Sequence, residues 1–467
     1  MARVVIIGGG PGGYEAALVA HDLGAEVTIV DRDGLGGSAV LTDCVPSKTL
    51  IATSDLMIDM SGGPELGINF ADSEGDAATT IRVDLAKVNA RVKTLAAAQS
   101  HDIEERLIRR GIEVVRGIGR LGEGSAGGRV VATSPDGSER TLHADAVLIA
   151  TGARPRTLPT AQPDGERILT WEQVYDLTEV PSELIVVGSG VTGAEFASAY
   201  LSLGIPVTLV SSRDRVLPGE DADAASVLED VLTRRGMKVL SKSRMQSVTR
   251  EGDTVTVTLT DGRTVTGSHC ILALGSIPNT EGLGLEEAGV QLDGGGFVQV
   301  DRVSRTTAPG VYAAGDCTGG FMLASVAAMA GRTAMRHFLG DAVRPLNLRQ
   351  VSSNVFTSPE IATVGVTQSA IDKGEVEAEV VRLDLAGNPR AKMQGVHDGF
   401  VKLFARPGSG TIIGGVVVGP RASELIHPIA LAVSANITVD QMAASYTVYP
   451  SMSGSIAEAA RRLHHVD

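Results

Sequence analysis

Cysteine is scarce in this sequence, and the few thiols lie far apart. Only Cys44, Cys270 and Cys317 occur among 467 residues. This number and spacing exclude a disulfide framework and a zinc site built from closely spaced ligands. We therefore predict no bound metal and a location in the reducing cytoplasm.

Basic charge and long apolar runs are lacking as well. The chain has 41 Lys and Arg against 55 Asp and Glu, and its formal net charge is −14. Such a chain does not attract nucleic acid or an anionic membrane without a local basic patch. No apolar run reaches the roughly 20 residues that span a bilayer. The apolar segment that starts at residue 3 leaves no room for an export signal. We predict no nucleic-acid partner and no integral membrane segment.

Glycine, in contrast, is abundant. The chain has 56 glycines, and 43% of its residues are apolar. This composition is typical of a globular α/β protein with many tight turns between strands and helices. Because a domain usually takes roughly 100–200 residues, the length indicates about three domains.

The N-terminal segment has the pattern of a dinucleotide-binding unit. RVVIIGGGPGGYEAALVAHDLGAEVTIVD is an apolar strand, a turn with Gly8, Gly10 and Gly13, a helix, and a second strand that ends in Asp31. The glycines let backbone N–H groups and the helix N-terminus meet a pyrophosphate, and the acid accepts a ribose hydroxyl. With strand, helix and acid in register, the pattern predicts a bound dinucleotide.

The same pattern recurs in ELIVVGSGVTGAEFASAYLSLGIPVTLVSSRDR. Its turn contains Gly188, Gly190 and Gly193, and its helix carries Glu195. The chain is therefore predicted to bind two dinucleotides.

The acidic residue is missing from the second unit. Ser211 stands at the position that corresponds to Asp31, and Ser212, Arg213 and Arg215 follow it. A carboxylate there would repel a 2′-phosphate, whereas this serine and these arginines could accept one. The pattern therefore favours NADPH, or either nicotinamide cofactor. The alternative is that the arginines are surface charges and NADH binds through other contacts, because the third glycine keeps the form usual at NAD sites.

Further strand ends set the predicted domain boundaries. AVLIATGARP and CILALGSIPN are apolar strands that end at Gly152 and Gly275 and are followed by a proline. This pattern is typical of the end of a dinucleotide-binding domain, where the chain crosses to the next domain. In TTAPGVYAAGDC, the carboxylate of Asp316 follows a strand and can accept a sugar hydroxyl. From Arg344 the strands and helices follow an α+β pattern. We predict domains at 1–153, 154–275, 276–343 and 344–467.

The order of these motifs resembles one family along essentially the whole chain. It runs GxGxxG, PSK, ATG, GxGxxGxE, a second glycine–proline crossing, YAAGD and a C-terminal α+β domain. This order is similar to that of the flavoprotein disulfide reductases, the dihydrolipoamide dehydrogenase and glutathione reductase family. The resemblance implies an α/β fold with two Rossmann-like domains. These are an FAD domain in two pieces and an inserted NAD(P) domain, followed by a C-terminal dimerisation domain that makes a homodimer.

The resemblance also assigns binding residues. It implies that FAD is held by Gly8, Gly10, Gly13, Asp31, Gly37, Ser38, Gly119, Thr151, Gly152, Asp316, Leu323 and Ala324. The residues predicted to hold the nicotinamide nucleotide, from the second glycine unit and the second crossing, are Gly188, Gly190, Gly193, Glu195, Ser211, Arg213 and Gly275. Lys48 of the PSK segment would pair with Glu195 beside the flavin. A buried lysine needs a carboxylate partner, and its positive charge stabilises an anionic reduced flavin.

The chain departs from the family at the residues of the thiol chemistry. The family has a C-x4-C pair that passes electrons from reduced flavin to an external disulfide. Here Ala39 stands at the outer position, and only Cys44 remains. The family also places an acid–base histidine, held by a glutamate, before a proline near the C-terminus. Here YPSMSG has Tyr449 and Gly454 at these positions, and a phenol does not shuttle protons at neutral pH as an imidazole does.

Two roles remain open for the remaining thiols. Cys317 could meet Cys44 in a disulfide if their Cα atoms lay within about 7 Å. Cys44 itself either touches the flavin as a thiolate, which the start of the PSK helix favours, or is a packed and idle thiol.

These features together predict an FAD enzyme without dithiol chemistry. NAD(P)H would give hydride to the flavin, and the reduced flavin would reduce a quinone directly, as in the members of the family that lack the redox disulfide. Lys48, Glu195, Cys44 and Tyr449 are the predicted catalytic residues, with Tyr449 reaching the acceptor from the partner subunit. The alternatives are a pyridine nucleotide transhydrogenase, or a flavin-bearing structural or sensing dimer with low turnover.

Overall fold

The computed structural model describes residues 1–68, 82–122 and 128–464. Its chain divides into two compact units. Unit 1 consists of Met1–Thr49, Asn89–Arg156 and Gly275–Asn347. Unit 2 consists of Leu50–Val88, Thr157–Leu274 and Leu348–Asp467.

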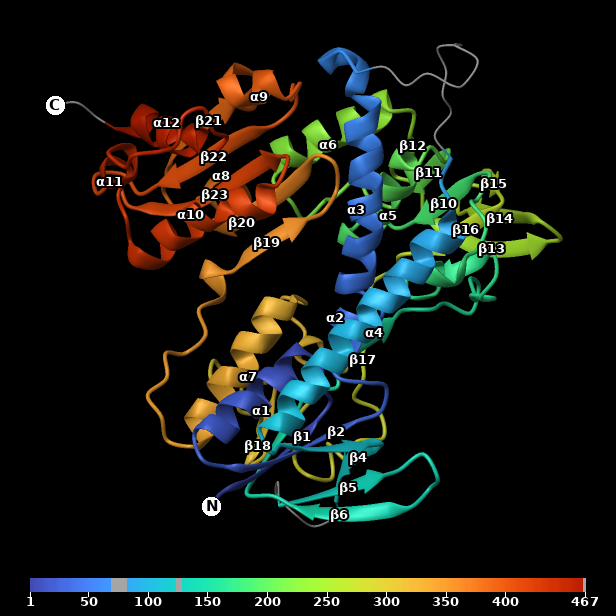
Figure 1. Ribbon diagram of the computed structural model, residues 1–467, viewed down its shortest axis with the longest axis vertical. Coiled ribbons are helices and arrows are strands. Elements are labelled where there is room, and N and C mark those ends of the chain that lie inside the picture. Colours follow the sequence, from blue (N-terminus) through green and yellow to red (C-terminus); the bar gives the residue numbers. More distant parts are fainter. Residues whose placement is uncertain (69–81, 123–127, 465–467) are drawn as a thin grey trace. The chain divides into compact units, whose positions relative to one another are not determined.

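Unit 1 is built on a five-stranded parallel sheet with the order β18-β7-β1-β2-β3. Figure 1 labels β1, β2 and β18 of this sheet. Its strands are β1 (Arg3–Ile7), β2 (Glu26–Asp31), β3 (Glu113–Arg116), β7 (Ala146–Ile149) and β18 (Val311–Ala313). The central strands are short apolar runs and are buried, as expected of a parallel sheet that is covered on both faces.

Two helices of unit 1, α1 (Pro11–Asp22) and α7 (Ala324–Phe338), cross at very close range. A Cβ atom built on Gly331 would lie 2.0 Å from the carbonyl oxygen of Gly12, so only glycine allows this approach. An ion pair between Arg332 and Glu15, at 2.8 Å, joins the same two helices. This packing fixes α1, whose N-terminus follows the first glycine turn.

Smaller elements complete unit 1. Three antiparallel strands are β4 (Ile118–Leu121), β5 (Arg129–Thr133) and β6 (Glu139–His143). A two-stranded ribbon joins β8 (Ala153–Pro155) to β17 (Ser276–Pro278), and the short helices are α2 (Gly37–Leu41) and η3 (Asp316–Thr318). Two long helices have residues in both units, namely α3 (Cys44–Ser61) and α4 (Leu85–Arg109).

Unit 2 contains a second parallel sheet with the order β12-β11-β10-β16-β9. Its strands are β9 (Ile168–Thr170), β10 (Leu184–Val187), β11 (Val207–Val210), β12 (Lys238–Leu240) and β16 (His269–Leu272). Helices α5 (Val191–Ser202) and α6 (Ala222–Arg234) follow β10 and β11, and an antiparallel sheet is formed by β13 (Met245–Glu251), β14 (Thr254–Leu259) and β15 (Thr264–Gly267).

The C-terminal part of unit 2 is an antiparallel sheet with the order β19-β20-β23-β22-β21. Its strands are β19 (Ser352–Val355), β20 (Glu360–Gly365), β21 (Glu379–Asp384), β22 (Phe400–Ala405) and β23 (Ile412–Gly419). Its helices are α8 (Gln368–Asp372), α9 (Pro389–Met393), α10 (Ala422–Ala435), α11 (Val439–Ala443) and α12 (Gly454–Leu463). Short 3-10 turns occur at η1 (Gly63–Leu66), η2 (Gln173–Asp176), η4 (Leu348–Gln350) and η5 (Leu385–Gly387).

The predicted α/β fold is confirmed. Two parallel sheets each carry a strand–glycine turn–helix unit, and an α+β part follows them. Within the described ranges, no helix is long and apolar enough to cross a bilayer.

Candidate functional site

The first glycine turn joins β1 to α1 in unit 1, and steric contacts require two of its glycines. Gly8 has a φ of +105°, and a Cβ atom on it would lie 2.3 Å from the carbonyl oxygen of Ala150. A Cβ atom on Gly13 would lie 1.9 Å from the carbonyl oxygen of Gly8. Around Gly10, the N-cap of α1, a Cβ atom would meet nothing within 4 Å. The N-terminus of α1 is therefore open to an anionic group.

Asp31 lies at the carboxyl end of β2 and binds this turn. Its carboxylate accepts the backbone N–H of Gly9 at 2.7 Å, of Asp33 at 3.0 Å and of Gly34 at 2.6 Å. The side chain is buried beneath these contacts. It therefore holds the glycine turn against the end of the second strand, where the pattern predicts a ribose.

The start of α2 folds closely over the N-terminus of α1. A Cβ atom on Gly37 would lie 2.8 Å from the Cα atom of Gly10, and Gly37 has a φ of +56°. Ser38 follows in α2, and its carbonyl oxygen accepts the N–H of Asp43 at 2.7 Å. Because Gly10 and Gly37 have no side chains, the backbone of α2 can lie close over the place where a pyrophosphate would bind.

Cys44 and Lys48 lie one turn apart on α3, so they share a face of this helix. Both side chains are half-buried. All three cysteines lie in the described ranges and none of them forms a disulfide, so Cys44 is not bonded to Cys317. Burial raises the pKa of the Cys317 thiol to about 11, and it also raises that of Cys270 in β16.

The backbone at Thr151 and Gly152, at the predicted end of the first domain segment, is hydrogen-bonded to Asn279, which the sequence pattern did not single out. The hydroxyl of Thr151 donates to the carbonyl oxygen of Asn279 at 2.7 Å, and the Asn279 amide donates to the carbonyl oxygen of Thr151 at 3.0 Å. Gly152 has a φ of +69°. The only sequence signal for Asn279 was its place after the proline of the second crossing.

Asp316 begins η3, beyond the end of β18. Burial, followed by the charge of Asp43, raises the pKa of its carboxyl to about 6. Leu323 and Ala324 lie at the N-terminus of α7. Gly119 lies in β4, where a Cβ atom would be 3.0 Å from the side chain of Ile7, so this position packs closely against the sheet.

The second glycine turn, in unit 2, has the same geometry as the first. A Cβ atom on Gly188 would lie 2.1 Å from the carbonyl oxygen of Ala273, and one on Gly193 would lie 1.8 Å from the carbonyl oxygen of Gly188. Gly190 is the N-cap of α5 and faces open space. Gly275 follows β16 with a φ of +86°.

Ser211 is fully buried at the end of β11, and its hydroxyl contacts the protein itself. Its oxygen lies 2.7 Å from the hydroxyl oxygen of Ser189, in the glycine turn, and accepts the N–H of Arg213 at 3.1 Å. Arg213 is exposed. The Nε atom of Arg215 is buried and has no hydrogen-bond partner within the part of the chain that the structure describes. An anion beside these arginines would satisfy it.

Glu195 lies on α5 and is buried. Its Oε1 accepts the backbone N–H of Phe356 at 2.8 Å. Lys48 belongs to unit 1 and Glu195 to unit 2, so their pairing stays a prediction.

Tyr449 lies before α12 and is 81% exposed. Its neighbours Tyr446 and Val448 are also exposed. Gly454, at the position of the family's glutamate, begins α12. This loop therefore presents apolar and aromatic side chains to the surroundings.

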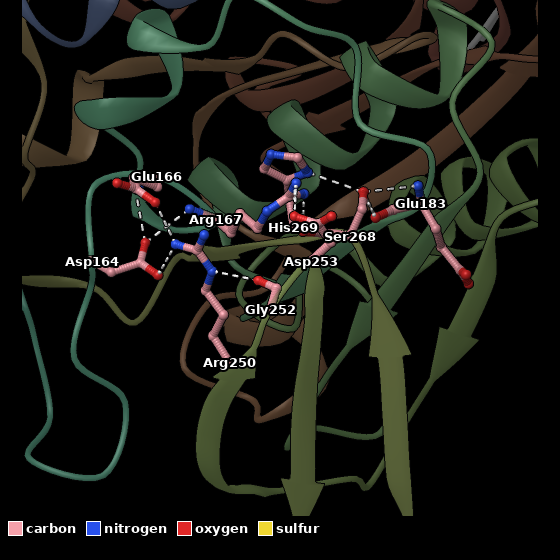
Figure 2. Close-up of polar contacts among 9 residues, drawn as sticks. All are labelled: Asp164, Glu166, Arg167, Glu183, Arg250, Gly252, Asp253, Ser268 and His269. Atoms are coloured by element: carbon pink, nitrogen blue, oxygen red, sulfur yellow. Dashed lines mark hydrogen bonds and ion pairs between the residues drawn. The ribbon is translucent and has the colours of Figure 1, made fainter.

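A polar network that the sequence did not predict lies at the amino end of β16 in the second sheet (Figure 2). Arg250 donates to Asp164 at 3.1 Å and to Glu166 at 2.6 Å, and His269 contacts the Ser268 hydroxyl at 3.0 Å. Figure 2 also draws Arg167, Glu183, Gly252 and Asp253. The glycine turn follows the carboxyl end of β10 and this network borders the amino end of β16, so the two lie at opposite ends of this parallel sheet.

Protonation of His269 is expected to give a pH-dependent stability. Burial, then the charges of Arg167 and Arg250, lower its pKa from 6.5 to about 4. As the pH falls, His269 is protonated in the unfolded chain before it is protonated in the folded chain. The contribution of neutral His269 to the stability of the fold is therefore complete above pH 6.5 and is lost as the pH falls toward 4. We expect the free energy of unfolding in urea to fall by about 2–3 kcal/mol over this range. His269→Asn, which keeps an N–H donor, should flatten the curve; equal slopes for both proteins would contradict the assignment.

Metal ligands do not gather within the described ranges. These ranges contain no group of three or more His, Cys, Asp or Glu residues that could hold a metal ion.

Comparison with known proteins gives one consistent result. The family model described as pyridine nucleotide-disulphide oxidoreductase matches residues 2–331. The model of the dimerisation domain of the same family matches residues 351–460.

Individual relatives match along nearly the whole chain. A protein of Mycobacterium tuberculosis H37Rv named NAD(P)H dehydrogenase (quinone) is 57% identical over 471 residues, which cover 99% of this chain and 94% of the relative. A dihydrolipoyl dehydrogenase of Chlorobaculum tepidum is 33% identical over 462 residues, which cover 98% and 96%. The crystal structure of LpdA from Mycobacterium tuberculosis has a TM-score of 0.94 and 56% identity, with 100% of both chains covered.

Proposed function

The chain belongs to the pyridine nucleotide-disulphide oxidoreductase family, and we propose that it is an FAD-dependent NAD(P)H:quinone oxidoreductase. The observation that carries this proposal is Ala39, which stands where the family has the second thiol of its redox pair with Cys44. A single sulfur cannot store an electron pair as an intramolecular disulfide, so electrons must leave the flavin directly. The 57% identity to a protein named NAD(P)H dehydrogenase (quinone) supports the same acceptor.

The residues of unit 1 fit FAD. The open N-terminus of α1 at Gly10, beneath the start of α2, suits a pyrophosphate, and Asp31 and Asp316 suit ribose and ribitol hydroxyls. Bound FAD would supply hydride acceptance from the nicotinamide and electron transfer to the quinone. We assign residues 1–153 and 276–343 to this cofactor, 154–275 to the nicotinamide nucleotide and 344–467 to the dimer interface.

NADPH is the nicotinamide nucleotide that we propose for the second turn. Ser211 offers no carboxylate to repel a 2′-phosphate. Arg213, two residues further on, is exposed. The Nε atom of Arg215 is buried and has no hydrogen-bond partner among the described residues. A phosphate between these side chains would gain charge-assisted hydrogen bonds. Glu195 and Lys48 would border the hydride-transferring ring, with Tyr449 beside the acceptor across a homodimer interface. The cytoplasm is the compartment that we propose.

Kinetics and a reductive titration test the function. We expect NADPH oxidation with menadione or benzoquinone, no thiol-dependent turnover of lipoamide, and uptake of two electrons per flavin. Four electrons per flavin, or lipoamide turnover, would show a second redox group and overturn the proposal. Efficient hydride transfer from NADPH to NAD⁺ without quinone would favour the transhydrogenase. Failure of NAD(P)H to bleach the flavin would favour the structural or sensing dimer.

Arg213→Ala tests the nucleotide assignment. Loss of a charge-assisted bond of about 1.5–3 kcal/mol should lower kcat/KM for NADPH by about 10- to 100-fold. The value for NADH should stay within about twofold, because NADH lacks the phosphate. The control is Lys238→Ala, an exposed lysine at the amino end of β12, away from the turn. Equal losses with both nucleotides would refute the phosphate contact.

A further inference from the structure

The backbone that follows β19 is bound to the helix of the second glycine turn. Strand β19 is at the edge of the C-terminal sheet and pairs with β20 as far as Val355. Beyond it, the N–H of Phe356 donates to Glu195 at 2.8 Å, and the N–H of Ser358 donates to the hydroxyl oxygen of Ser198 at 3.1 Å. Side chains of α5 therefore act as partners for backbone groups that have left the sheet.

The two acceptors match the two donors in spacing. Glu195 and Ser198 are three residues apart on α5, so they lie on one face of the helix. Phe356 and Ser358 are two residues apart, as backbone donors on one side of an extended chain are. Glu195 is 5% exposed and Ser198 is 2% exposed, whereas Phe356 and Ser358 are half-buried, so the acceptor side of both bonds is shielded from water.

A third contact joins the same segment to α6. The guanidinium of Arg235, directly after the last residue of α6, donates to the carbonyl oxygen of Ser358 at 3.1 Å. All of these residues belong to unit 2. The 356–358 segment is thus held by the helices that follow two neighbouring strands of the nucleotide-binding sheet.

We propose that the 356–358 segment is a positioning element for the Glu195 carboxylate, and that Ser198 is the positioning residue that holds this segment in place. An N–H bonded to a carboxylate restricts its rotamer and fixes its direction. The inference rests on the proposed function, in which Glu195 borders the ring that transfers hydride. The C-terminal part of the chain would then contribute to hydride transfer through a backbone group of Phe356, at a site that its sequence does not mark.

Ser198→Ala removes the acceptor for the Ser358 N–H and leaves Glu195 itself unchanged. The matched control is Ser202→Ala, one turn further along α5, because the hydroxyl of Ser202 donates to the carbonyl oxygen of Ser198 within the helix. Ser198→Thr restores the hydroxyl and serves as the rescue variant. Each variant is prepared as the FAD-bound full chain.

Anaerobic stopped-flow reduction of the flavin by NADPH measures the effect. We expect Ser198→Ala to slow flavin reduction about fivefold with an unchanged dissociation constant for NADPH, whereas Ser202→Ala and Ser198→Thr stay within about twofold of the unmodified protein. In a Glu195→Ala background, Ser198→Ala should have no further effect, because it acts through Glu195. Independent, multiplicative losses in the double variant would overturn the proposal.

Hydrogen exchange of the same FAD-bound variants provides a second readout. The Phe356 amide is bonded to Glu195 and not to Ser198, so its exchange reports on the whole segment. Ser198→Ala should accelerate exchange of this amide about five- to tenfold, and Ser202→Ala should not. Unchanged Phe356 exchange would overturn the proposal even if the rate fell. If the unmodified protein is not reduced by NADPH at all, the proposed function fails, and exchange alone then decides whether the segment holds Glu195.

Discussion

Gly13→Ala is expected to abolish FAD binding by disrupting the fold of unit 1, whereas Gly10→Ala is expected to abolish it in a folded chain. A Cβ atom on Gly13 would lie 1.9 Å from the backbone oxygen of Gly8, so α1 or the turn must shift. Such overpacking costs about 3 kcal/mol or more where backbone must move. The same helix is held tightly by α7 through Gly12 and Gly331, so it has little freedom to relax.

Gly10→Ala differs because the added methyl group meets no protein atom within 4 Å, and its φ of −67° suits any residue. The methyl group would instead occupy the space where a pyrophosphate approaches the helix N-terminus. We expect an apoprotein whose melting temperature stays within about 3 °C of that of the unmodified apoprotein, and an FAD affinity at least about 100-fold lower.

The FAD content per chain, the circular dichroism spectrum and the melting temperature of both variants distinguish these outcomes. Normal FAD content in Gly10→Ala would place the pyrophosphate elsewhere. A stable, FAD-loaded Gly13→Ala protein would show that the turn relaxes more easily than this packing indicates.

Local patterns made much of the fold predictable. The glycine turns, their strands and their helices lie within short stretches, and two of the three pattern glycines in each turn avoid a steric clash with backbone of the same unit. Asp31 was recognisable for the same reason, because it ends the strand that follows the helix. Such features depend on residue type and spacing, which the sequence displays directly.

Contacts between distant segments were not predictable in this way. Nothing near Phe356 indicates that its N–H binds a carboxylate 161 residues earlier. The contact of the Ser211 hydroxyl with Ser189 was not predictable either, because the sequence cannot show which side chains a turn encloses. Lys402 gave a weak signal as the one charged residue in the strand FVKLFA, since a lysine among buried apolar residues needs a partner.

Lys402→Met is expected to cause the second large loss. Its ammonium lies 2.9 Å from Asp221 and 2.7 Å from Asp223, and the side chains of Lys402 and Asp221 are only 4% and 3% exposed. Asp221 also caps α6 by accepting the N–H groups of Asp223 and Ala224. Removal of the lysine leaves a buried carboxylate without its cation, which should lower the free energy of unfolding by about 3–5 kcal/mol.

Urea unfolding of the single and double variants tests whether unpaired charge is the cause. Asp221→Asn replaces the buried carboxylate by a neutral amide that still caps a helix, so the double variant Lys402→Met/Asp221→Asn should recover most of the loss. The control is Arg461→Ala, which breaks an exposed ion pair with Glu458 and should cost less than about 0.5 kcal/mol. If the double variant is as unstable as Lys402→Met, lost packing around the lysine stem, and not its charge, would stabilise the contact between β22 and α6.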